Sequence, residues 1–100
     1  MIEEDISHLK SRINDLLSEL HGIGPVMRGS VTEIGNKNKH PHFSVSIKGK
    51  TKLIYLGAHR VAKAQAYSDN YRRLMEITQE MTLLNMEILK REGLEDKNKK

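Results

Sequence analysis

The sequence predicts an α+β fold in which an N-terminal helix and a long C-terminal helix flank a three-stranded antiparallel sheet. Apolar residues recur at helical spacing before position 22 and after position 58. Between these segments, residues 42–48 alternate polar and apolar side chains without a break, which is typical of a half-buried strand. At 100 residues, the chain is expected to form a single domain that spans residues 1–100.

Residues 3–22 are expected to form the first helix. Apolar side chains recur there at alternate steps of three and four residues, at Ile6, Leu9, Ile13, Leu16 and Leu20. The glycines and the proline at positions 22–25 then indicate the end of the helix. A helix this short is marginal in isolation, so its apolar side must pack on another element.

Residues 26–57 are expected to form the sheet. Its three strands are predicted at residues 26–34, 42–48 and 51–56, separated by turn-forming residues. Successive side chains of a strand point to opposite faces, so the middle strand has an apolar face and a polar one. The apolar face carries Phe43, Val45 and Ile47, and the polar face carries Ser44, Ser46 and Lys48.

The turn at Gly49 allows two registers for the second and third strands. A two-residue turn pairs Ile47 with Lys50, so that Ile54 joins the apolar face and Tyr55 points outward. A three-residue turn would instead bury Leu53 and Tyr55. We favour the two-residue turn, partly because of the resemblance described below.

Residues 58–92 are expected to form one long helix, with residues 93–100 as a flexible tail. At about 1.5 Å per residue this helix is about 50 Å long, roughly twice the length that the first helix covers. The uncovered apolar surface predicts a coiled-coil-like homodimer. Its interface is expected to consist of Leu74, Thr78, Met81, Leu84, Asn85 and Ile88. Asn85 has two interpretations: it is a polar interface residue that fixes the register of the two helices, or it is an ordinary surface residue.

The positive charge is concentrated in the predicted sheet. The net charge of the chain is +4, but residues 25–63 carry eight Lys/Arg residues against a single acid, Glu33. Residues 1–24 and 64–96, on either side, each have a net charge of −3. This asymmetry favours a surface that binds a polyanion, although lysines also protect exposed strand edges.

Several kinds of protein are not indicated by this sequence. The chain has no cysteine, and His40, His42 and His59 have no neighbouring acid that would complete a set of metal ligands. No catalytic constellation and no phosphate-binding glycine loop are recognisable, so we expect neither an enzyme nor a bound cofactor. The acidic N-terminus is unlike a signal peptide, and no apolar stretch is long enough for a membrane span. A cytoplasmic protein without membrane contact is therefore expected.

The central region resembles the DNA-binding domain of plant AP2/ERF factors and the arm-binding N-terminal domains of tyrosine integrases. The resemblance rests on Gly29-Ser30-Val31, the strand Phe43–Lys48, Gly49-Lys50, Tyr55-Leu56-Gly57 and alanines 62, 64 and 66. It implies a three-stranded sheet, backed by a helix, that lies in the major groove of DNA. It also implies that outward residues contact bases and phosphates, at the matching positions Thr32, Ser44, Ser46, Lys48 and Tyr55.

A longer part of the chain, residues 23–89, is similar to an uncharacterised family of short bacterial and archaeal proteins often encoded near transposases. The shared features are Arg28-Gly29-Ser30, Gly49-Lys50-Thr51, Tyr55 and residues 70–74, Asn-Tyr-Arg-Arg-Leu. The corresponding loop, residues 35–42, lacks the family's cysteine, so this resemblance implies no metal site.

Charge, sheet and resemblance together predict a small dimeric protein of mobile-element or phage type that binds double-stranded DNA. The expected contact residues are Arg28, Thr32, Lys37, Lys39, His40, Ser44, Ser46, Lys48, Lys50, Lys52, Tyr55 and Arg60. One alternative is a protein-interaction module, such as a phage inhibitor or an accessory factor, whose basic sheet binds an acidic protein surface. Another is a helical oligomerisation scaffold.

Overall fold

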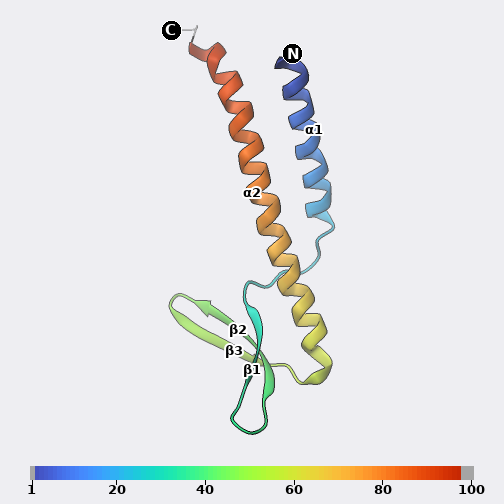
Figure 1. Ribbon diagram of the computed structural model, residues 1–100, viewed down its shortest axis with the longest axis vertical. Helices are drawn as coiled ribbons and strands as arrows, with labels where there is room; N and C mark the ends of the chain where they lie inside the picture. Colours follow the sequence, from blue (N-terminus) through green and yellow to red (C-terminus); the bar gives the residue numbers. More distant parts are fainter. Residues whose placement is uncertain (1, 98–100) are drawn as a thin grey trace. The chain divides into compact units, whose positions relative to one another are not determined.

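The computed structural model describes residues 2–97, with side chains from residue 6 to residue 92. In chain order the elements are α1 (Ile2–His21), β1 (Ser30–Ile34), β2 (His40–Ile47), β3 (Lys50–Tyr55), a 3-10 turn η1 (Ala58–Arg60) and α2 (Val61–Lys97) (Figure 1). The predicted α+β order of helix, three strands and long helix is therefore confirmed. Within the described part of the chain, neither helix combines the length and the apolar character that crossing a membrane requires.

The chain divides into two compact units, which are described separately. The sheet unit consists of Ile23–Arg73, and the helical unit of Met1–Gly22 and Leu74–Lys100, so that α2 contributes to both. The sequence of the sheet unit holds ten Lys/Arg residues and two acids, a net charge of +8. The sequence of the helical unit holds seven Lys/Arg residues and eleven acids, a net charge of −4. The two units are thus oppositely charged.

The strands of the sheet unit form one antiparallel sheet in the order β1-β2-β3. Ile47 pairs with Lys50 and Phe43 pairs with Ile54, which is the register of the two-residue turn. The two turn residues, Lys48 and Gly49, have φ angles of 52° and 80°. Positive φ at both central residues is typical of the type I′ turn that matches the twist of a hairpin.

The core of the sheet unit lies between the sheet and the first turns of α2. Phe43, Leu56 and Ala64 are buried together, and Met27 and Val31 pack against them with Val45 and Val61. The small side chain of Ala64 lets α2 approach the sheet closely. The buried Ser68 of α2 donates a hydrogen bond of 2.9 Å to the carbonyl oxygen of Gly29, which joins the helix to the start of β1.

The first strand is shorter than the sequence predicts. A strand was expected over residues 26–34, but β1 begins at Ser30. The preceding segment bonds to α2 instead of to β2: Met27 donates its backbone N–H to the carbonyl of Tyr67, and the side-chain amide of Asn70 donates to the carbonyl of Pro25. These bonds satisfy the backbone of the segment without a neighbouring strand.

The helical unit consists of α1 and the C-terminal part of α2, which lie side by side and antiparallel (Figure 1). Leu16 of α1 and Ile77 of α2 are fully buried, and Ile88 is nearly so. Arg12 also donates two hydrogen bonds to the carboxylate of Glu80, at 2.8 and 3.1 Å. The seam that the sequence shows along α1 therefore packs within the chain.

The predicted end of the long helix needs revision. Its end was expected before Gly93, but α2 continues to Lys97, and the flexibility expected of this tail stays a prediction. A glycine inside a helix costs about 1 kcal/mol relative to alanine, which does not suffice to end this one. The last three residues of the predicted tail, 98–100, lie outside the described residues.

The six residues predicted for the homodimer interface occupy two environments. Ile88 is buried within the helical unit, and Leu74, Met81 and Leu84 are partly buried there. Thr78 and Asn85 are exposed. The exposed apolar side chains of this part of α2 are others, namely Met75, Leu83, Met86 and Leu89.

Candidate nucleic-acid interface

One face of the sheet packs against α2 and forms the core, and the other face is open to solvent. The strand register places Val31, Phe43 and Ile54 on the core face, against α2. The opposite face is called the free face here, and none of its side chains is buried. Its residues are Ser30, Thr32, Ile34, His40, His42, Ser44, Ser46, Thr51, Leu53 and Tyr55.

The free face brings together five of the residues predicted to contact DNA. Thr32 comes from β1, three come from β2, and Tyr55 comes from β3; the three from β2 are His40, Ser44 and Ser46. A hydroxyl both donates and accepts hydrogen bonds, so these side chains can contact phosphate oxygens as well as base edges. Hydroxyls discriminate weakly between bases, so the face is suited to contact rather than to strict sequence reading.

Tyr55 lies between two histidines on the free face. Its ring centroid is 5.5 Å from that of His42 and 6.0 Å from that of His40, and both pairs are edge-on. The ring of His42 is held in place because its Nδ1 lies 2.9 Å from the carbonyl oxygen of His40. With these edge-on contacts to the two histidine rings, Tyr55 is still 54% exposed. The face therefore presents an aromatic group to solvent at the end of β3.

Three predicted lysines lie at the two ends of β2. Lys37 and Lys39 are exposed in the loop between β1 and β2, and Lys48 is exposed in the turn between β2 and β3. β2 has eight residues, and at about 3.3 Å per residue the two ends are about 26 Å apart. The free face thus extends between two groups of positive charge, while the face itself carries no Lys, Arg, Asp or Glu among its described residues.

The other four predicted cations lie on the opposite side of the sheet. Lys50 pairs with Ile47 and Lys52 with Val45, so both alternate onto the core face. Arg28 donates from Nη2 to the carbonyl of Ser46 at 2.6 Å. Arg60 donates from Nε to the carbonyl of Leu56 at 2.8 Å and from Nη2 to that of Tyr55. The structure therefore does not bring these four to the free face.

Five residues belong to the free face but were not among the predicted contact residues, namely Ser30, Ile34, His42, Thr51 and Leu53. Each is separated by an even number of positions from a predicted residue on the same strand. The period of two, applied in the two-residue-turn register, would have placed them on this face.

Neither a metal site nor a related protein explains this surface. Among the described residues, no group of three or more His, Cys, Asp or Glu side chains is placed to hold a metal ion. Comparisons with protein-family models, curated proteins and solved structures found no match. The two resemblances noted in the sequence therefore stay predictions.

Proposed function

We propose that this chain binds double-stranded DNA with the free face of its sheet, and that it does so as a homodimer. The observation that carries the proposal is a free face whose described residues include no carboxylate and which ends at Lys37 and Lys39 on one side and at Lys48 on the other, within a sheet unit of net charge +8. A duplex is a dense polyanion, and a protein binds it first by placing cations near its phosphates. The origin of the protein in a phage or mobile element stays a prediction that rests on the resemblance alone.

The geometry of the free face supports a groove-bound sheet. The major groove of B-DNA is about 12 Å wide and admits a two-stranded β-ribbon. β2 is about 26 Å long by its eight residues, so a strand that crosses the groove extends beyond both walls. In that position Lys37 and Lys39 at one end, and Lys48 at the other, would reach phosphates on either side, while hydroxyls such as those of Ser44 and Ser46 would face the bases.

The proposed second copy of the chain would dock on the exposed side of α2. Met75 and Met86 are 11 residues apart, about three helical turns, so they align along one side, with Leu83 and Leu89 beside them. That side is roughly opposite to buried Ile77 and Ile88. Two helices alone bury few side chains, and a second pair of helices would cover this apolar strip.

Fluorescence anisotropy with labelled duplexes of unrelated sequence tests the proposal. Three phosphate contacts for each copy predict a slope of about −2.7 in log affinity against log salt, so the dissociation constant should rise about 40-fold between roughly 50 and 200 mM salt. A homodimer with both sheets on one duplex would double that slope. Binding that is independent of salt, or absent at low salt, would contradict the proposal.

Leu53→Glu and Ile54→Glu form a matched pair that tests the face. Both residues lie in β3 and are 51% exposed, but Leu53 is on the free face and Ile54 on the core face. Each change adds one negative charge to the same strand. We expect Leu53→Glu to weaken duplex binding about tenfold or more, and Ile54→Glu to weaken it much less. Equal losses would exclude the free face as the DNA contact. Tighter binding to an unpaired strand than to a duplex would indicate that the ligand is single-stranded DNA, with its bases stacked on Tyr55.

A further inference from the structure

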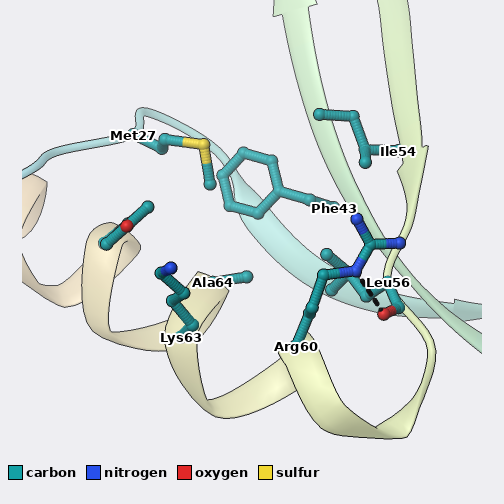
Figure 2. A pocket seen from close by; sticks show the side chains of 8 residues that line it. Met27, Phe43, Ile54, Leu56, Arg60, Lys63 and Ala64 are labelled. Carbon is teal, nitrogen blue, oxygen red and sulfur yellow. Dashed lines mark hydrogen bonds between the residues drawn. The ribbon is translucent and has the colours of Figure 1, made fainter.

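A shallow apolar groove lies on the core face of the sheet unit, away from the proposed DNA contact. It consists of two adjoining hollows of about 140 and 280 Å³, which share Met27, Phe43 and Ile54. The first hollow extends to Leu56, Arg60, Lys63, Ala64 and Tyr67. The second extends to Arg28, Val45 and Ile47. Figure 2 shows the first hollow, with the ring of Phe43 beside Met27 and with Lys63 and Ala64 of α2 below them in this view.

The groove exists because the first turns of α2 do not cover the whole core face, and the edge strand β3 and the tip of the hairpin are left exposed. The tip of the hairpin points away from the first turns of α2 (Figure 1). Phe43, near the helix, is only 2% exposed, whereas Ile47 and Ile54 on the same face are 43% and 51% exposed. The core face therefore continues as an apolar surface beyond the part that α2 covers, and this surface would gain from burial against a partner.

Positive groups border this apolar surface. Arg28 lines one hollow, and Arg60 and Lys63 line the other. No carboxylate lines either hollow among the residues that the structure describes. Lys50 and Lys52 add two more cations on the same face towards the tip of the hairpin.

Both arginines are held in position by the backbone. Arg28 is bonded to the carbonyl of Ser46, and Arg60 to the carbonyls of Tyr55 and Leu56, as the dashed line to Leu56 in Figure 2 indicates. A carbonyl oxygen does not neutralise the charge, and a guanidinium has five N–H donors, more than these bonds use. The charges are thus fixed beside the groove and available to an anion, and little side-chain freedom would be lost when one binds.

We propose that this groove binds an acidic peptide segment that places one or two apolar side chains against Phe43 and Ile54. The apolar floor is complementary to a hydrophobic anchor residue, and the cations at its border are complementary to carboxylates beside that anchor. A nucleic acid fits less well, because the ring at the centre of the floor, Phe43, is only 2% exposed and is not available for base stacking, and the floor itself is apolar. The partner is therefore a protein segment rich in Asp or Glu and in Leu, Ile or Phe.

This peptide site is separate from the proposed DNA contact. Neighbouring residues of β3 alternate between the two surfaces, with Ile54 in the groove and Leu53 on the free face. One chain could therefore hold a peptide and a duplex at the same time, on opposite faces of one sheet. Such a protein would connect an acidic partner to DNA.

Selection of random peptides displayed on phage, with the full chain as bait, tests the partner chemistry. We expect enriched peptides to combine acidic residues with an apolar anchor. Fluorescence anisotropy of a labelled enriched peptide should show a dissociation constant about tenfold higher for Ile54→Gln, and about threefold higher for Lys63→Gln, than for the unchanged chain. Leu53→Gln serves as the matched control, because Leu53 has the same exposed fraction of 51% in the same strand, and it should leave the constant unchanged.

Three outcomes would overturn the peptide site. Enrichment of basic or uncharged peptides would contradict the role of the cations. Equal weakening by Leu53→Gln and Ile54→Gln would move the contact out of the groove. A DNA duplex that loses affinity with Ile54→Gln but not with Leu53→Gln would make the groove a nucleic-acid site. Peptide binding that survives in a chain unable to bind DNA would leave this inference intact while the proposed function failed.

Discussion

Gly29 lies just before β1, where the chain passes the ring of Phe43. Its φ is +141°, a backbone conformation that other residues rarely adopt. A Cβ atom at this position would lie 2.5 Å from the carbonyl oxygen of Ser44 and 2.7 Å from Cε1 of Phe43. The absence of a side chain thus lets β1 approach β2 and lets Phe43 fill the core.

We therefore expect Gly29→Ala to lower the free energy of unfolding by about 2–4 kcal/mol, through strain and overpacking. Gly49→Ala is the matched comparison, because φ is also positive there, at 80°, but a Cβ atom would have no neighbour within 4 Å. Its cost should be about 1 kcal/mol. Urea denaturation followed by circular dichroism measures both values. If the two variants lose the same stability, the contact with Phe43 does not limit this position.

At the scale of the elements, the hairpin of β2 and β3 decides which side chains reach the proposed DNA. Lys48 occupies the first central position of its turn with φ at 52°, where a lysine is strained and an asparagine is not. The same lysine lies at one end of the free face. The turn therefore combines a conformational demand with a proposed phosphate contact, and the two can be separated by mutation.

We expect Lys48→Asn to raise the free energy of unfolding by about 0.5–1 kcal/mol, because asparagine tolerates the positive φ. It should also weaken DNA binding and reduce the salt slope by about 0.9 for each copy. Lys52→Gln removes one charge from the core face of the same hairpin and should change the slope much less. Thermal denaturation and anisotropy at several salt concentrations measure the two effects. A larger effect of Lys52→Gln would place DNA on the other face.

The sequence contained most of the information about this hairpin. The alternation of Phe43, Val45 and Ile47 and the turn at Gly49 predicted the strand faces and the register correctly. The same alternation assigns Lys50 and Lys52 to the core face, but charge counted along the chain does not distinguish the faces of a strand. The sequence could not predict which carbonyl oxygens bind Arg28 and Arg60. An oxygen is available to a side chain only where no neighbouring strand bonds to it, and this depends on where the strand pairing ends.

The helices illustrate a different limit of sequence reasoning. Spacing of three and four residues predicted that one side of α2 is covered, and of the residues it singled out Ile88 is buried and Leu74 and Met81 are partly buried. It did not single out Ile77, which is fully buried. Spacing does not say whether the covering helix belongs to the same chain or to a second copy, because both produce the same pattern. In the helical unit, α1 of the same chain lies along α2.

At the scale of the whole molecule, the proposed homodimer depends on which side of α2 is free to contact a second copy of the chain. Met86 is 53% exposed and belongs to the apolar strip on one side of the helix. Asn85 is also exposed, but it belongs to the interface first predicted from the sequence. We expect Met86→Glu to convert a dimer into a monomer, because a charge would enter the apolar contact, and Asn85→Glu to leave the dimer intact.

Size-exclusion chromatography with light scattering measures the molar mass of both variants. A monomeric unchanged chain would refute the homodimer, and dissociation by Asn85→Glu alone would restore the interface predicted from the sequence. Dissociation should also halve the salt slope of DNA binding if both sheets of a dimer contact one duplex.

The alternation within β3 gives its two-residue turn an unusual influence over the molecule. Thr51, Leu53 and Tyr55 belong to the free face, whereas Lys50, Lys52 and Ile54 belong to the core face. Loss of the codon for Gly49, with a two-residue turn re-formed from Lys48 and Lys50, would pair Ile47 with Thr51. Lys50 would move into the turn, and the remaining side chains of these two sets would exchange faces. A deletion at the tip of the hairpin, distant from the core, would thereby replace the chemistry of both binding surfaces in one evolutionary step.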